Sequence, residues 1–85
     1  METFIGQIIL FAGSYTPVGF AACDGALLPI SNYTALFSLL GTTYGGDGTA
    51  NFALPKMSAS ALTGAKEGEG ARYLIAIEGI YPPRN

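Results

Sequence analysis

The stretch ALFSLLGTTYGGDG, from Ala35 to Gly48, places a short apolar helix directly before a turn rich in glycine. The residues that recur at helical spacing and predict one apolar face are Tyr33, Leu36, Phe37 and Leu40. Gly41 predicts the end of this helix, because glycine readily adopts the left-handed conformation that stops one. The stretch contains no general base, no group of metal ligands and no phosphate-binding lysine. It therefore favours scaffolding or docking over catalysis.

The start of the helix is predicted from the residues just before it. Pro29 ends the preceding arm, and Ser31 is expected to cap the helix by accepting a hydrogen bond from a free backbone N–H of the first turn. The predicted helix covers about residues 32–40 and is the only one expected.

Short strands are predicted on the N-terminal side of the helix. Phe4 to Ala12 has too few polar positions for alternation, so we expect a central strand buried on both faces. Thr16 to Gly19 is a predicted turn with proline at its first corner. Phe20 to Cys23 begins a second strand, and the dipeptide Asp24-Gly25 predicts a two-residue hairpin into residues 26–28.

The chain after the helix is predicted to hold loops and two further strands. Residues 42–50 form a glycine-rich loop, Phe52 to Leu54 a brief strand, and residues 56–70 an exposed segment. Tyr73 to Ile80 alternates in polarity and predicts the clearest strand. We expect an α+β fold: a small single domain over residues 1–85, mostly short β-strands with one short α-helix and long glycine-rich loops.

Composition predicts that the chain associates with other chains. Its 85 residues give a small core, and its single cysteine, Cys23, excludes an internal disulfide. Charged residues are 12% of the chain and hydrophobic residues 49%, whereas a typical soluble domain has roughly 25% charged residues. A surface so poor in charge favours self-association.

Several other classes of protein are disfavoured. The net charge is -2 and the four cations are dispersed, so the sequence has no basic surface for nucleic acid. Residues 3–23 carry no charge, but Glu2 stands where a signal peptide needs basic residues. Glycines and Pro17 interrupt any run long enough to span a membrane. We expect neither a signal peptide nor a membrane span.

Four blocks of the sequence resemble one known family. They are GQIILFAG at Gly6–Gly13, PVGFAACDGALLPIS at Pro17–Ser31, ALFSLLGTTYGGDGTANFALP at Ala35–Pro55, and YLIAIEGIYPPRN from Tyr73. In this order they resemble the phage tail collar domain family, also labelled microcystin-dependent or tail fibre proteins. The long middle block is the most specific part of the resemblance.

The resemblance implies a structural module of phage tail fibres or related injection particles, usually homotrimeric, without catalytic residues or cofactors. Phe20 stands where many members have tryptophan, which keeps an apolar anchor and removes an indole N–H. The chain also has no histidine, whereas longer members carry a histidine-bearing tail region. This short version therefore argues against a receptor tip organised by metal.

The predicted turn contains the first candidate site. Its residues are Gly41, Gly45, Gly46, Asp47 and Gly48. The loop could bind an anion through backbone N–H groups, or Asp47 could help to hold a cation. The favoured interpretation is a structural turn in which glycines supply positive φ and Asp47 bonds its own backbone.

Other candidate residues concern binding to partners. Phe20, Tyr44 and Tyr81 are candidate aromatics for a subunit interface or a ligand, and Arg72 and Arg84 are candidates for ion pairs between subunits. Cys23 is interpreted as a small buried hydrophobe, because no histidine is present to activate it.

The function expected from these observations is a non-enzymatic, self-assembling structural subunit of a phage tail fibre, an injection particle or an extracellular filament. Its expected partners are further copies, as a trimer or a filament, and other tail or fibre proteins. The alternative is a module that binds a host-surface glycan through the loops at residues 44–49 and 58–70. The expected location is the virion tail or an extracellular particle.

Overall fold

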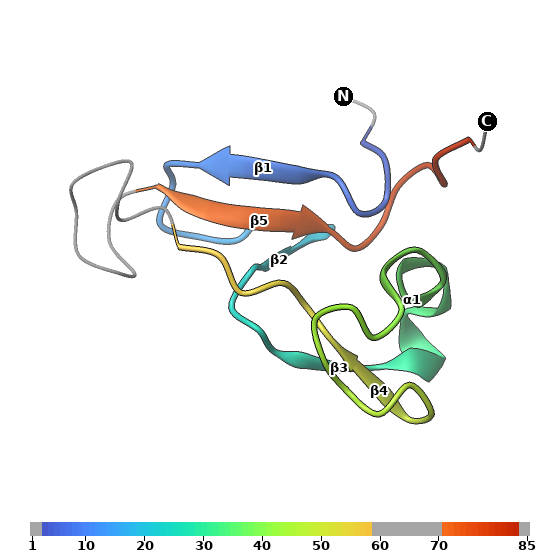
Figure 1. Cartoon of the computed structure of the whole chain (residues 1–85). Helices are drawn as coiled ribbons and strands as arrows, with labels where there is room; N and C mark the ends of the chain where they lie inside the picture. The colour runs from blue at the N-terminus through green and yellow to red at the C-terminus, as the bar shows by residue number, and fades with distance from the viewer. Residues whose placement is uncertain (1–2, 59–70, 84–85) are drawn as a thin grey trace.

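The computed structural model describes residues 3–58 and 71–83. In these residues, the larger of two sheets has its strands in the order β1-β5-β2. β1 (Ile8–Phe11) and β2 (Phe20–Ala22) each pair antiparallel with β5 (Arg72–Ala76), which lies between them (Figure 1). Because both outer strands are antiparallel to β5, they run parallel to each other. The connection between them, residues 12–19, must therefore cross β5.

The smaller sheet and the helix form the second part of the fold. β3 (Leu27–Pro29) pairs antiparallel with β4 (Asn51–Ala53), and Leu28 lies opposite Phe52. The chain between these strands forms the 3-10 turn η1 (Ile30–Asn32) and the helix α1 (Thr34–Leu40), seen beside the smaller sheet in Figure 1. Short strands with a single short helix among the described residues confirm the predicted α+β class.

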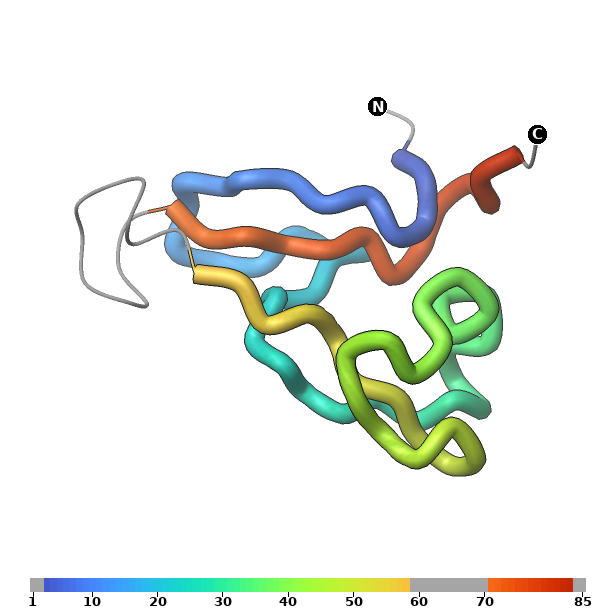
Figure 2. The backbone as a smooth tube through the Cα atoms, in the orientation of Figure 1, coloured from blue at the N-terminus to red at the C-terminus, as the bar shows by residue number. Residues whose placement is uncertain are grey.

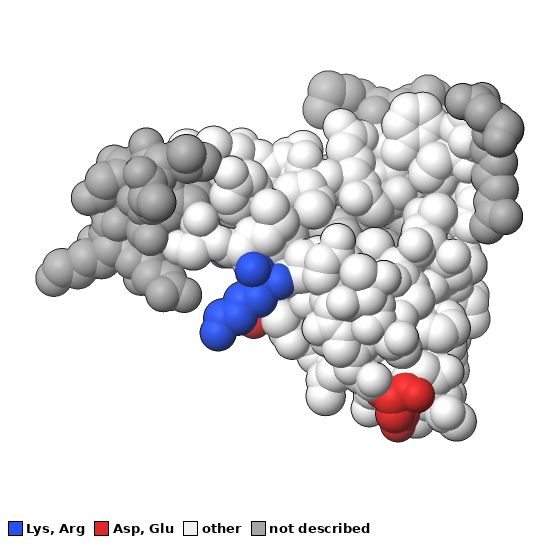
Figure 3. Space-filling view, in the orientation of Figure 1, with Lys and Arg blue, Asp and Glu red and all other residues white. Residues whose placement is uncertain are grey.

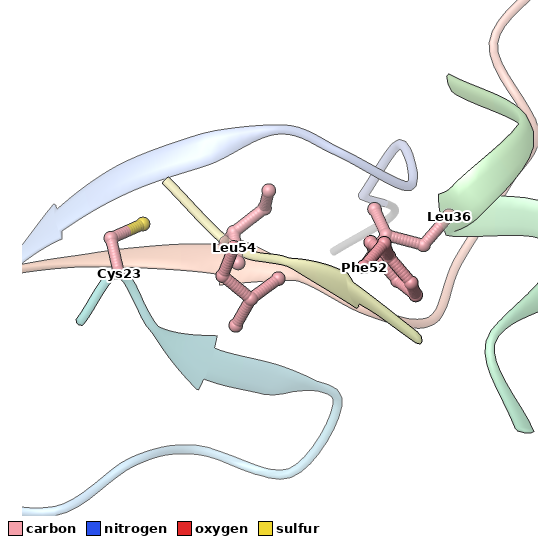
Figure 4. Packing of buried hydrophobic residues seen from close by; sticks show 5 residues of the cluster. Cys23, Leu36, Phe52 and Leu54 are labelled. Atoms are coloured by element: carbon pink, nitrogen blue, oxygen red, sulfur yellow. The ribbon is translucent and has the colours of Figure 1, made fainter. Parts of the chain in front are cut away.

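The core joins both sheets to the helix. Its cluster of buried side chains consists of Cys23, Leu36, Phe52, Leu54 and Ile75. Figure 4 shows the labelled side chains in a row, from Cys23, just after β2, through Leu54 and Phe52 to Leu36 on α1. Leu36 is 1% exposed, and Tyr33, Phe37 and Leu40 pack against the cluster. The predicted apolar face of the helix is confirmed.

The two ends of the described chain meet at one end of the larger sheet. Phe4 and Ile80 form a parallel bridge, the Ile5 amide donates to the Ile80 carbonyl at 2.9 Å, and the Ile80 amide donates to the Thr3 carbonyl at 2.8 Å. Figure 2 shows the corresponding blue and red segments side by side. These bonds hold the two terminal segments together beyond the ends of β1 and β5.

The prediction of a central N-terminal strand buried on both faces was wrong. β1 begins only at Ile8 and lies at the edge of its sheet, with Ile8 and Leu10 exposed. The reason is a turn before the strand, in which the Gln7 amide donates to the Phe4 carbonyl at 3.0 Å. That turn removes residues 4–7 from the strand.

The centre of the sheet is β5, for which the sequence predicted alternating faces. Leu74, Ile75 and Ala76 are all 0% exposed, so both faces of this strand are buried. The strand is also shorter than predicted and ends at Ala76. Ile75 belongs to the core cluster on one face, and Leu74 and Ala76 lie on the opposite face by alternation.

The hairpin predicted at Asp24-Gly25 does not form. β2 and β3 belong to different sheets, and the chain passes between them at this dipeptide. The Ala26 amide donates to Asp24 Oδ1 at 2.9 Å, and the Gly25 amide donates to the Pro55 carbonyl at 3.3 Å. Asp24 has no positive φ, which the predicted turn would require. The side-chain bond stabilises a bend instead.

Three boundaries also differ from prediction. Ser31 lies within η1 and does not cap α1, whose N-cap is Tyr33 without a side-chain bond. In the turn before β2, the Phe20 amide donates to the Pro17 carbonyl at 3.1 Å. Pro17 is therefore the first residue of this turn, whereas the sequence predicted it at the first corner, one position later in the turn. β4 begins at Asn51, one residue before the predicted start.

The predicted exposed segment at residues 56–70 is described only in its first part. Lys56, Met57 and Ser58 are exposed, as predicted. Residues 59–70 lie outside the described residues.

Candidate functional site

The glycine-rich loop after α1 is built by backbone conformation. Gly41, Gly45, Gly46 and Gly48 all have positive φ. At Gly46 a side chain is also excluded by space, because a β-carbon there would stand 2.5 Å from Cα of Phe52 and 2.9 Å from the Asn51 carbonyl oxygen. The loop therefore folds back directly onto β4, whose Ala53 amide donates to the Gly45 carbonyl at 3.0 Å.

Asp47 holds the tip of this loop. Its Oδ1 accepts hydrogen bonds from the amides of Thr49, Ala50 and Asn51 at 2.8, 2.8 and 3.1 Å. The Asp47 amide in turn donates to Asn51 Oδ1 at 3.0 Å. The amides that donate to the charged carboxylate lower the pKa of Asp47. The loop uses this oxygen internally, as the structural-turn interpretation requires.

Near Asp47, the described part of the chain forms no group of metal ligands. Among residues 3–58 and 71–83, no group of three or more cysteine or acidic side chains is placed to hold a metal ion. The loop amides at positions 49–51 are directed at the aspartate rather than at an external anion.

The three candidate aromatics lie on three different elements. Phe20 is partly buried in β2, Tyr44 is 50% exposed in the loop after α1, and Tyr81 is 40% exposed after β5. Tyr81 Oη lies 2.6 Å from Ser38 Oγ, which links the C-terminal segment to α1. Of the three, Tyr44 presents the most accessible ring to a ligand or a partner.

Arg72 binds the connection that crosses β5. Its guanidinium donates to the carbonyls of Tyr15 at 2.6 Å and Gly13 at 3.5 Å, and to Thr16 Oγ1 at 3.4 Å. Leu74 and Ala76 share its face of β5 by alternation, and both are fully buried. Arg72 thus fastens the connection over this face of the strand. Arg84, the other candidate for an ion pair, lies outside the described residues.

Cys23 lies at the wall of a hollow of about 480 Å³ next to β5. The hollow is also lined by Lys56, Met57, Arg72 and Tyr73. Burial, and secondarily the negative charge of Asp24, raise the pKa of Cys23 to about 11. A thiol with this pKa is protonated at neutral pH and is a poor nucleophile.

The described surface carries very little charge. Figure 3 shows one cluster of basic atoms and two small acidic areas on a face that is otherwise uncharged. Large hydrophobic side chains are exposed instead, and they include Phe4, Ile8, Leu10, Tyr15, Val18, Leu27 and Tyr44. No helix among the described residues combines the length and hydrophobicity needed to cross a bilayer.

Sequence analysis missed two features of this surface. One is the role of Arg72 within its own chain, which depends on contacts with residues more than fifty positions away. The other is the exposed edge of β1. It was missed because a run of apolar residues predicts a buried strand whether the strand lies at the centre or at the edge of its sheet.

These features define a class of protein: a small module in which Asp47 holds a turn and Arg72 holds two segments together. The chain belongs to the phage tail collar domain family, whose sequence model matches residues 6–62. No curated protein matches the chain. Membership associates the chain with the structure of a phage tail.

Proposed function

We propose that this protein is a self-assembling structural subunit of a phage tail fibre, a phage-like injection particle or a related extracellular filament. The observation that carries the proposal is an apolar exterior with little charge. Val18 is 96% exposed, Tyr15 66% and Leu27 59%. Exposed apolar surface of this extent is typical of surfaces that other protein covers.

The proposed role includes no catalysis. Asp47 is committed to its own loop, Arg72 to the connection that crosses β5, and Cys23 to the core. The Cys23 thiol is protonated at neutral pH, and the chain has no histidine that could act as its base.

Electron microscopy of the purified protein tests the proposal. We expect rings, short fibres or filaments, since an exterior of this kind is covered by copies or by other tail proteins. Monodisperse particles of single-chain size under all concentrations and salts tested would refute self-assembly.

A second candidate function is recognition of a neutral host-surface glycan by the loop at residues 44–49. The observation that favours it is the half-exposed ring of Tyr44 on a loop held by Asp47, because sugars stack on exposed aromatic rings that are fixed in place. A glycan array with wild type and Tyr44→Ala tests this function. Tyr15→Ala removes an even more exposed ring and is the matched control. Binding lost only in Tyr44→Ala is expected, and no binding by wild type would eliminate this candidate.

A further inference from the structure

The exposed edge of β1 presents unused backbone groups. Gln7 lies opposite Ala76 of β5, and the Ala76 amide donates to the Gln7 carbonyl at 2.9 Å. The carbonyl group of Gln7 therefore points toward β5. In an antiparallel pair, residues alternate between bonding the neighbour and facing away from it. Ile9 and Phe11 therefore bond β5, whereas the N–H and C=O groups of Ile8 and Leu10 point away from the sheet.

A bulge limits this edge at its N-terminal end. The Gly6 amide also donates to the Ala76 carbonyl at 2.9 Å, so that Gly6 and Gln7, the two residues just before β1, lie opposite the single residue Ala76. Beyond the bulge, β1 runs in regular register from Ile8 to Phe11. The part of the edge open to pairing is therefore short.

At the other strand edges of the described chain, turns, loops or a proline occupy some or all of the outward positions. At β2, the Phe20 amide is bonded to the Pro17 carbonyl at 3.1 Å and the Ala22 carbonyl to the Asp24 amide at 2.9 Å. At β4, the outward Ala53 amide is bonded to the Gly45 carbonyl.

β3 is protected in a different way. Pro29 occupies an outward position on its edge and has no N–H. Prolines, turns and covering loops are the usual devices that prevent edge-to-edge pairing. Within residues 3–58 and 71–83, β1 lacks all of them.

Among residues 3–58 and 71–83, no hydrogen-bond partner is found for the outward groups of β1. Neither Ile8 nor Leu10 has a further hydrogen bond among the described residues. Their side chains are 38% and 50% exposed, and they lie on the same face as Ile75, which belongs to the core. The apolar face of the sheet thus continues beyond the area that β3, β4 and α1 cover.

We infer that β1 pairs antiparallel with β1 of a second copy about a two-fold axis, an inference that rests on the proposed self-assembly. The axis passes beside Ile9, so that Ile8 lies opposite Leu10 of the second copy and Leu10 opposite its Ile8. In this register every outward N–H and C=O group of Ile8 and Leu10 obtains a partner. The larger sheets of the two copies then form one continuous sheet.

The edge is complementary to itself for two reasons. Shifting the register by one residue would place an outward residue opposite one whose groups bond β5, so only alternate registers are available. No charge lies between residues 3 and 23, so two copies of this edge do not repel each other. Pairing of β1 with β2 of a second copy is disfavoured, because the turns at Pro17 and Asp24 have already used groups of that edge.

Sedimentation velocity of wild type and two variants tests the inference. Leu10→Lys places a charge in the paired edge at a half-exposed position, and Leu27→Lys places the same charge at a similarly exposed position on the protected edge of β3. We expect Leu10→Lys to shift the protein to a smaller species and Leu27→Lys to sediment like wild type. Circular dichroism verifies that each variant is folded.

Disulfide trapping tests the register without removing the interface. Ile9 lies opposite Ile9 of the second copy as a pair without hydrogen bonds, whose Cα atoms are about 4.5 Å apart, within the range that a disulfide spans. In a Cys23→Ala background, Ile9→Cys is expected to give a covalent dimer on mild oxidation. Leu10→Cys is the control, since its counterpart is displaced along the strand.

The outcomes separate this inference from the proposed function. Assembly of wild type that persists unchanged in Leu10→Lys, or equal trapping of both cysteine variants, would overturn the β1 interface and leave self-assembly intact. A wild type that is monomeric at every concentration would overturn both.

Discussion

Gly46 lies so close to Phe52 that a β-carbon at position 46 would stand 2.5 Å from Cα of Phe52. The glycine loop and β4 are thus joined through backbone alone, and Phe52 is 0% exposed beneath them. This relationship connects the loop after α1 to the centre of the core.

Gly46→Ala is therefore expected to destabilise the protein. The substitution adds a clash to a positive φ of 92°, and alanine at positive φ alone costs more than about 0.4–1 kcal/mol. Chemical denaturation measures the loss in free energy of unfolding. Gly41→Ala is the control, because a β-carbon there meets nothing within 4 Å. An equal loss in both variants would show that the close approach to Phe52 is unimportant.

Phe37→Asp is expected to abolish folding. The Phe37 ring centroid lies 5.5 Å from that of Phe52, so the variant places a carboxylate against the core. Far-UV circular dichroism and the thermal transition report the outcome. Leu39→Asp on the same helix is the control, since Leu39 is 36% exposed and surface substitutions usually change stability by about 0.5 kcal/mol. A cooperative transition in Phe37→Asp would contradict the placement of this helix face.

The helix and the glycine loop could be predicted from sequence because their signals are local. Helical spacing identified the face with Leu36, and the glycines marked the positions of positive φ. The start of the helix could not be predicted, because η1 takes the residues around Ser31 that resemble a cap.

Strand pairing could not be predicted in the same way. β1 and β5 are both apolar, but only β5 is central. The local sequence does not show this difference, because the partners of β5 lie about fifty or more residues earlier in the chain. The Asp24-Gly25 dipeptide suggested a hairpin, but the bond from the Ala26 amide to the Asp24 side chain and the contact with Pro55 direct the chain into another sheet. Of the candidate residues, Asp47 had a local role open to prediction, whereas the contacts of Arg72 are all long-range.

Asp47→Ala is expected to weaken the loop, and Asp47→Asn to weaken it less, because the amide oxygen still accepts the backbone bonds. The pKa of Asp47 is lowered in the folded state. Its contribution is therefore present above the unfolded pKa of about 3.9 and is lost as pH falls through the folded pKa. Unfolding measured across acidic pH should show a smaller pH dependence in Asp47→Asn than in wild type. Identical profiles would mean that the carboxylate does not stabilise the loop.

Arg72→Ala is expected to loosen the connection at residues 12–19. Hydrogen bonds to charged groups contribute about 1.5–3 kcal/mol, and here they join β5 to the Tyr15 and Gly13 carbonyls. Hydrogen exchange should accelerate in residues 12–19 of Arg72→Ala. The exchange rate in Arg72→Lys should lie between those of wild type and Arg72→Ala, because lysine keeps the charge but cannot bridge several oxygens in this geometry. A change in subunit association with unchanged exchange would instead support a role for Arg72 between subunits.

Sedimentation equilibrium of the wild-type protein over a wide dilution series tests most directly whether copies shelter this exterior. We expect a mass that rises with concentration above the 8.8 kDa of the single chain, accompanied by a melting temperature that rises in parallel. A mass of one chain and a constant melting temperature at every concentration would contradict the proposal that the protein is built to assemble.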